Sequence, residues 1–171
     1  MKKFIALLGL SLVMVGCGRS DVASDSESSD GAGDSAYLVQ TEPEGALPVG
    51  EARKVAENDD EVTLVGLIGG SAEPFVNGIA AFTIVDAKVP YCAADEGCAT
   101  PWDYCCETVA VKDNIATIKV VDEAGAPVSQ DARKLLNVKE LSTVVVQGTA
   151  MRDELGNLTV SAKQVFVRPS I

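Results

Sequence analysis

The pattern of apolar and polar residues changes character near Glu61. Beyond this point apolar side chains alternate with polar ones over short runs, and turns rich in Gly, Asp and Pro separate the runs. Alternation with a period of two is typical of β-strands, because successive side chains point to opposite faces of a sheet. The pattern predicts five strands, at residues 62–68, 80–86, 116–122, 143–152 and 158–168.

Two short helices are expected beside these strands. Residues 51–57 predict a helix of about two turns that ends before the first strand. Between the third and fourth strands, Ser129 can cap a second helix, since side-chain oxygens of this kind bind the free N–H groups of a first turn. Its apolar residues at helical spacing are Ala132, Leu135 and Leu136.

The last predicted strand contains a break in its alternation. Val160 and Ala162 share one face, whereas Val165 lies on the other face. An extra residue in one strand shifts the faces in this way, so the sequence predicts a bulge near residues 163–164. Gly148, in the preceding strand, suits a sharp bend of a long barrel strand.

The order of elements and three sequence runs indicate one fold. Three strands, a helix and two further strands form the OB-fold, a five-stranded, partly open Greek-key barrel. The runs VTLVGLIGG, AAFTIVD and STVVVQGTAMRDELGNLTVSAKQVFV resemble strands of exported bacterial OB-fold domains. The resemblance implies an all-β fold with one short helix over residues 61–171, with a Cys-rich insertion between strands 2 and 3 at residues 88–114.

The N-terminal part resembles that of an exported bacterial lipoprotein. Residues 1–16 combine a short basic start with an apolar run too short to span a bilayer, as in a signal peptide. Met14-Val15-Gly16-Cys17 resembles a lipobox, which implies that Cys17 becomes the first residue and carries two or three acyl chains. Residues 17–40 predict a disordered acidic tether, and residues 41–60 a transition segment.

This resemblance also implies a location. Gly18 stands where enteric lipoproteins that remain in the inner membrane carry Asp. We therefore expect a lipid-anchored protein of the cell envelope, at the periplasmic or surface face of an outer membrane rather than at the inner membrane. The expected partners are the membrane, through the anchor, and a protein or saccharide ligand of the barrel.

Composition excludes several kinds of activity. The 171 residues include 14 Lys and Arg, 25 Asp and Glu and no His, which gives a formal net charge of -11. Without imidazole the chain has no Ser-His-Asp triad, no Cys-His pair and no His-held metal. The missing His also separates it from the OB-fold haem chaperone of cytochrome c maturation, which holds haem through His. We expect no enzymatic activity and no cofactor.

Charge argues against nucleic-acid binding as well. Lys and Arg that neutralise phosphates supply most of the non-specific affinity for nucleic acids. Residues 61–171 contain 9 basic and 14 acidic residues, so the barrel itself repels phosphate. The OB-fold therefore does not by itself indicate a nucleic-acid ligand here.

Four cysteines stand together in the insertion: Cys92, Cys98, Cys105 and Cys106. In an exported chain such thiols are expected to form disulfides. Because neighbouring cysteines are poorly placed to bridge each other, two pairings remain. They are Cys92 to Cys105 with Cys98 to Cys106, or Cys92 to Cys106 with Cys98 to Cys105.

The alternative for these thiols is a redox-active pair or a thiolate site for zinc, copper or an iron–sulfur cluster. Four Cys suffice in number for such a site. The C-x2-C spacing typical of structural zinc and of redox pairs is absent, however. Disulfides are therefore the preferred interpretation, and we assign no metal ligands at this point.

The insertion also contains aromatic residues, in a chain that has few. Tyr91, Trp102 and Tyr104 are candidates for an exposed surface that binds a protein or saccharide. The alternative is that Trp102 packs over the disulfides or closes one end of the barrel.

Mass spectrometry of the intact mature protein tests these expectations together. We expect a chain that begins at Cys17, carries the mass of its acyl chains and has four blocked thiols in the insertion. Four titratable thiols or a bound metal would contradict the disulfide interpretation. An unacylated N-terminus at another residue would contradict lipidation.

Overall fold

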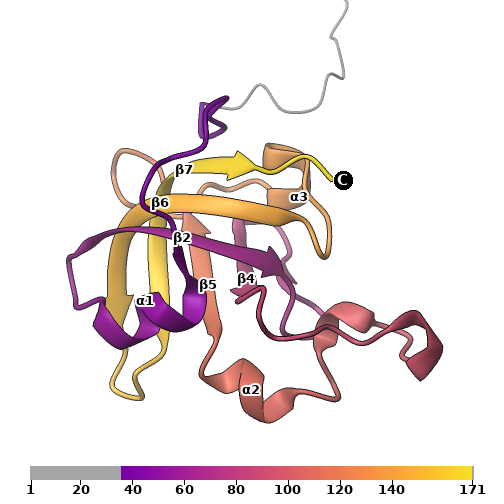
Figure 1. Cartoon of the computed structure of the whole chain (residues 1–171). Coiled ribbons are helices and arrows are strands. Elements are labelled where there is room, and N and C mark those ends of the chain that lie inside the picture. The colour runs from indigo at the N-terminus through magenta and orange to yellow at the C-terminus, as the bar shows by residue number, and fades with distance from the viewer. Residues whose placement is uncertain (1–35, 171) are drawn as a thin grey trace, which may run out of the picture. The chain divides into compact units, whose positions relative to one another are not determined.

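The computed structural model of the chain describes residues 36–170, drawn as the coloured ribbon in Figure 1. The predicted signal peptide, Cys17 and most of the tether lie outside these residues. The elements are β1 (Leu47–Pro48), α1 (Val49–Val55), β2 (Glu61–Ile68), β3 (Phe75–Val76), β4 (Ala81–Val85), the 3-10 helices η1 (Ala94–Glu96) and η2 (Pro101–Asp103), α2 (Thr108–Lys112), β5 (Ile115–Val120), α3 (Ala132–Leu136), β6 (Thr143–Arg152) and β7 (Leu158–Val167).

Five strands close into a barrel in the order β2, β4, β5, β7, β6 and back to β2. All neighbours are antiparallel except β5 and β7, which pair in parallel with Ile118 opposite Val160. β1 extends the sheet beside β2, and β3 extends it beside β4. With α3 between β5 and β6, this is the arrangement of the OB-fold. The predicted all-β, five-stranded Greek-key barrel is confirmed.

The barrel interior contains the apolar faces that the alternation predicted. Phe82 and Ile84 of β4 and Ile118 and Val120 of β5 are fully buried. The last two strands contribute Val144, Val146, Ala150, Leu158, Val160, Ala162 and Val165. Since burial of a large aliphatic or aromatic side chain stabilises a fold by about 1.5–3 kcal/mol, this interior is the main source of stability.

β6 and β7 bend together at a bulge. Gln147 pairs with Gln164, whereas the next residue, Gly148, pairs with Ala162. Lys163 is therefore the extra residue of β7, at the position where the apolar residues change face. The predicted bulge is confirmed, and it explains why residues on both nominal faces of this strand are buried.

Both ends of α1 are held by groups from the barrel. The N–H of Gly50 donates to Oδ2 of Asp86 at 2.8 Å, just beyond β4. At the other end, the guanidinium of Arg152 donates to the carbonyl oxygens of Arg53 and Ala56. These contacts satisfy backbone groups that helix ends leave without intrahelical partners. α1 starts and ends two residues earlier than predicted, and these contacts, which are distant in sequence, could not be seen in the local pattern.

α3 covers part of the barrel, as predicted, but its cap is different. The carboxylate of Asp131 accepts a hydrogen bond from the N–H of Arg133 at 2.9 Å, so the expected cap by Ser129 is wrong. Asp131 lies directly before the first helical residue, where an N-cap must lie. The guanidinium of Arg133 also lies 3.9 Å from the ring centre of Phe75. The buried residues of the helix are Ala132, Leu135 and Leu136.

Gly148→Ala should destabilise the barrel, because a Cβ at this position would lie 2.2 Å from the carbonyl oxygen of Ser161. Backbone atoms of a paired strand cannot move aside easily, so we expect a loss of about 3 kcal/mol in urea unfolding. Met151→Leu, an exposed position of the same strand, is the control and should change stability by no more than about 0.5 kcal/mol. Equal stability of both variants would contradict the close approach at Gly148.

Candidate metal centre

The Cys-rich segment leaves the barrel between β4 and β5, as predicted, and projects from it in Figure 1. Val85, the last residue of β4, pairs with Ile115, the first residue of β5. The two ends of the segment are therefore adjacent, and the residues between them must fold back on themselves. They do so through η1, η2 and α2.

Tyr104 attaches this segment to the barrel. Its side chain is fully buried and packs with Val85, Val89 and Val111 in a small apolar cluster separate from the main core. The residue has a φ of 57°, a left-handed conformation that is rare for bulky residues. Gly69 makes room for the ring, since a Cβ there would lie 2.9 Å from Cε2 of Tyr104. Burial of the ring thus offsets an unfavourable backbone conformation.

Burial of the Tyr104 ring also buries its hydroxyl group, which is unfavourable. The oxygen has no hydrogen-bond partner among the residues described. Burial, with a smaller contribution from Tyr91, raises the pKa of Tyr104 to about 12. A buried hydroxyl without a partner lowers stability by roughly 1–3 kcal/mol. The ring therefore stabilises the attachment, and the hydroxyl does not.

The three aromatic residues do not form one exposed surface. Tyr104 is in the interior, so it cannot contact a ligand at the surface. Trp102 is half-buried, and its indole N–H donates to the carbonyl oxygen of Ala72 at 3.1 Å. Its own carbonyl oxygen accepts the N–H of Gly70 at 2.8 Å. Trp102 therefore braces the loop after β2, and Tyr91, 48% exposed, is the one aromatic side chain of the three that is open to solvent.

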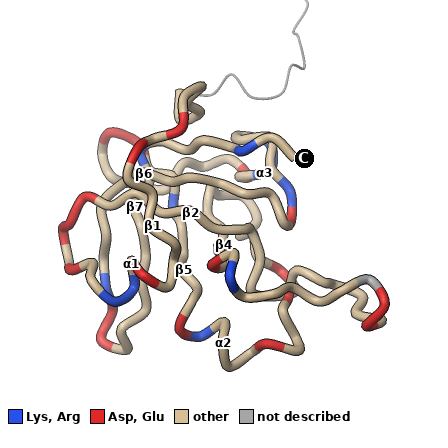
Figure 2. Tube along the Cα trace, viewed as in Figure 1, with Lys and Arg blue, Asp and Glu red and all other residues tan. Residues whose placement is uncertain are grey.

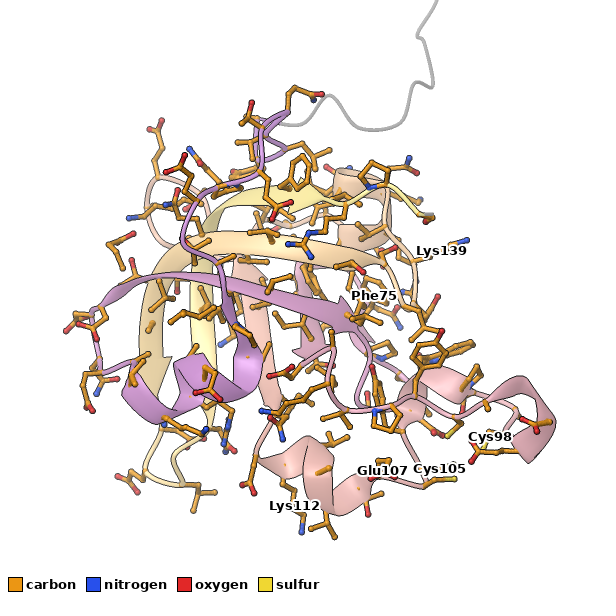
Figure 3. All side chains as sticks on the ribbon, in the orientation of Figure 1. Phe75, Cys98, Cys105, Glu107, Lys112 and Lys139 are labelled. Carbon is orange, nitrogen blue, oxygen red and sulfur yellow. The ribbon has the colours of Figure 1, made fainter. Side chains whose placement is uncertain are left out.

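The four cysteine side chains of the segment converge, and Figure 3 shows Cys98 and Cys105 at its projecting end. All four Sγ atoms lie within 4.8 Å of one another. The Sγ atom of Cys105 is 3.4 Å from that of Cys92, 3.2 Å from that of Cys98 and 3.8 Å from that of Cys106. The sulfurs of Cys92 and Cys106 are 3.9 Å apart. Within residues 36–170 this is the one group of three or more metal-ligating side chains close enough to share an ion.

Four of the sulfur separations, at 3.2 to 3.9 Å, are near or somewhat below the edge of a tetrahedron around one metal ion. Zinc binds thiolate sulfur at about 2.3 Å, and four such bonds at tetrahedral angles place the sulfurs about 3.8 Å apart. A disulfide joins two sulfurs at about 2.05 Å, and the four thiols are free in the structure. Two disulfides would also divide the sulfurs into separate pairs, whereas Cys105 contacts all three others. The disulfide pairing stays a prediction from the sequence.

Two local turns hold the cysteines in position. Oδ1 of Asp103 accepts the N–H of Cys105 at 2.8 Å, and the Thr100 hydroxyl donates to Oδ2 of Asp103 at 2.6 Å. Between the first two cysteines, the Glu96 carboxylate accepts the N–H of Ala93 at 2.5 Å. The sequence pattern does not by itself predict this structural role of the two carboxylates. The available signal was the spacing of Thr100 to Asp103, which suits a side-chain-capped turn.

The thiols differ in acidity. A hydrogen bond from the backbone N–H of Cys106 lowers the pKa of the Cys92 thiol. Contacts with Cys98 and Cys92 raise the pKa of the Cys105 thiol. At Cys106 the contact with Cys105 lowers the pKa, but the contact with Cys92 and the charge of Cys92 outweigh it, so the pKa is raised. Among these three thiols, Cys92 is therefore the one whose pKa is shifted toward the thiolate.

Charge around the cluster is entirely acidic in sequence. No Lys or Arg stands between Lys88 and Lys112, whereas Asp95, Glu96, Asp103 and Glu107 do. Figure 2 shows acidic and no basic positions at the projecting end of the segment. Four thiolates here would find no Lys or Arg within residues 89–111 to balance them, and a bound cation would offset part of their charge.

Comparison with known proteins gives no assignment. No protein family matches the chain, and no curated protein matches it significantly. None of the helices within residues 36–170 has the length and apolar character needed to cross a membrane. The barrel and the four converging sulfurs are therefore the features of the molecule that indicate a function.

Substitutions at Tyr104 should separate the contributions of its ring and its hydroxyl. Tyr104→Phe should be neutral or stabilising by about 1 kcal/mol, because it removes the unpaired hydroxyl. Tyr104→Ala should cost about 3–5 kcal/mol, because it empties the small apolar cluster. Urea unfolding measures both, and Tyr91→Phe, at an exposed position, is the matched control. A large loss in Tyr104→Phe would show that the hydroxyl has a stabilising partner.

Proposed function

We propose that the protein is an envelope lipoprotein whose barrel carries a mononuclear metal site formed by Cys92, Cys98, Cys105 and Cys106. The convergence of all four sulfurs to within 4.8 Å carries this proposal. Each thiolate would supply one bond of a tetrahedral four-sulfur site, as in closed zinc sites. Because the protein fills all four positions, the site is suited to holding an ion rather than to catalysis.

Zinc fits the site better than monovalent copper or an iron–sulfur cluster. A divalent ion balances two of the four thiolate charges and a monovalent ion only one, in surroundings without Lys or Arg. A cluster distributes its ligands around several atoms, whereas all four sulfurs here lie within 4.8 Å of one another, which suits a single centre.

The N-terminal sequence supports the location of this site. Met14-Val15-Gly16-Cys17 favours a lipid anchor, and the acidic residues that follow favour a flexible spacer before the barrel. On this proposal the protein presents a metal-binding module at the envelope, at the outer membrane rather than the inner one. A protein partner or a saccharide remains the candidate ligand of the module, with Tyr91 as its exposed aromatic contact.

A disulfide-stapled recognition segment is the second candidate. The expected oxidising compartment favours it, and both of its pairings lie within reach, since the four sulfurs are within 4.8 Å of one another. Two disulfides and a metal ion bound by four thiolates exclude each other, because each arrangement uses all four sulfurs. One experiment therefore separates the two candidates.

The full chain, purified under reducing conditions, should bind one Zn2+ per chain by elemental analysis. Co2+ in its place should give the absorption of a tetrahedral thiolate complex and change the fluorescence of Trp102, the sole Trp of the sequence. Replacing any of the four cysteines by Ser should lower zinc affinity by roughly 100-fold or more, because a bond to the ion is lost.

Cys17→Ser is the matched control, because it removes the one Cys outside the cluster. Its zinc stoichiometry and affinity should equal those of the unchanged chain. Four titratable thiols without bound metal would contradict the metal site. Four blocked thiols in protein taken directly from the envelope would favour the stapled segment instead.

A further inference from the structure

The four cysteines differ in how far solvent reaches them. Cys92 is buried, with 2% of its surface exposed, whereas Cys98 is half-buried and Cys105 and Cys106 are exposed. An ion among these sulfurs would be covered by protein beside Cys92 and open to solvent beside Cys105 and Cys106. An incoming ligand could therefore reach the ion without unfolding of the barrel.

The barrel keeps its core without help from the metal site. The main apolar cluster among the described residues unites α1, α3 and the barrel strands and includes none of the cysteines. The segment is attached through the buried ring of Tyr104 and through the hydrogen bond from the Gly70 N–H to the Trp102 carbonyl oxygen, at 2.8 Å. In small zinc domains, by contrast, the ion takes the place of a core and its loss unfolds the chain.

The ligands are also held in place by contacts that do not involve the sulfurs. The carboxylates of Asp103 and Glu96 close turns next to the cysteines through hydrogen bonds to backbone N–H groups. Gly97 has a φ of 73°, which lets the chain turn back before Cys98. Since the turns are built from backbone and carboxylate contacts, they persist when an ion leaves, and rebinding needs little reordering.

The surroundings of the open side indicate the chemistry of a partner. Asp95, Glu96 and Glu107 add negative charge around the sulfurs, and no basic residue offsets it in this part of the sequence. Such a surface attracts cations and a basic protein surface, and it raises the rate of encounter with both. Thiolates are the protein ligands best suited to compete for a thiophilic ion that four cysteines hold.

We propose that this site is exchangeable, and that it passes a divalent thiophilic ion to or from thiolates on a basic partner protein while the barrel stays folded. This inference rests on the proposed metal site and adds that the site transfers its ion. In the transfer, the bonds from the ion to the exposed Cys105 and Cys106 are exchanged first and the bonds to Cys98 and Cys92 follow. Each bond that breaks is replaced by a bond to a partner thiolate. The ion stays divalent, no electrons move, and the released thiolates take up the protons that the partner thiols lose.

Release of the ion from the zinc-loaded full chain tests the proposal. A chromogenic chelator in excess reports release, Trp102 fluorescence reports the segment, and far-ultraviolet circular dichroism reports the barrel. We expect release at least about tenfold faster than unfolding in the same buffer, with the barrel spectrum unchanged in the metal-free protein. Release at the unfolding rate, or loss of the barrel spectrum with the ion, would overturn the proposal.

Two variants test the effect of the acidic residues on zinc binding while all four cysteines stay in place. The double variant Asp95→Asn with Glu107→Gln should slow Zn2+ association by about two- to tenfold at low salt, with less effect at high salt. Glu154→Gln, in the turn between β6 and β7, removes an acid outside the segment and should leave the rate unchanged. Equal rates in all three proteins would overturn the role given to the acidic surroundings.

The outcomes also distinguish the two levels of the proposal. If Zn2+ does not bind at all, the metal site itself is wrong. If Zn2+ binds at one per chain but leaves only when the barrel unfolds, the site is structural and exchange alone is wrong.

Discussion

Closure of the barrel at β2 is the constraint on which the rest of the structure depends. β2 pairs along its length with β6 and, at its end, with β4 through Leu67 and Ile68. The two pairings are compatible because Gly66 has no side chain, and a Cβ there would lie 2.8 Å from the carbonyl oxygen of Val85. A closed sheet leaves no long edge open to other chains. Because side chains fill the barrel interior, the long segment between β4 and β5 must lie outside the barrel.

The cysteine cluster follows from that closure. Since Val85 and Ile115 are paired, the segment between them begins and ends at one place on the barrel rim. Tyr104 then attaches its middle to the same rim, through the apolar cluster that includes Val85. Cysteines on either side of these fixed points have little space in which to separate. The convergence of the sulfurs is thus a property of the barrel as much as of the segment.

Local signals predicted the barrel and long-range contacts decided the site. Alternation located the five long strands and the bulge at Lys163, because it follows directly from the geometry of a strand. The sequence did not predict β1, β3 and α2, because elements this short show no periodic pattern of apolar residues. Tyr104 gave no sign of burial, because its contacts come from Val85 and Val89, far from it in sequence. The number of cysteines and the expected oxidising compartment indicated disulfides, but the spacing gave no sign that all four sulfurs lie within 4.8 Å of one another.

The entry of the chain into the barrel has a mechanical consequence. Leu38 forms a single parallel bridge with Val165, and the Arg168 side chain pairs with Glu42 at 2.6 Å. A pull applied at residue 36 would load these few contacts first and peel them one after another. The stretch before β1 would then lengthen before the pairings of β2 with β4 and β6 carried the load. A moderate pull at this end would therefore extend the chain before it reached the strands that support the cysteine segment.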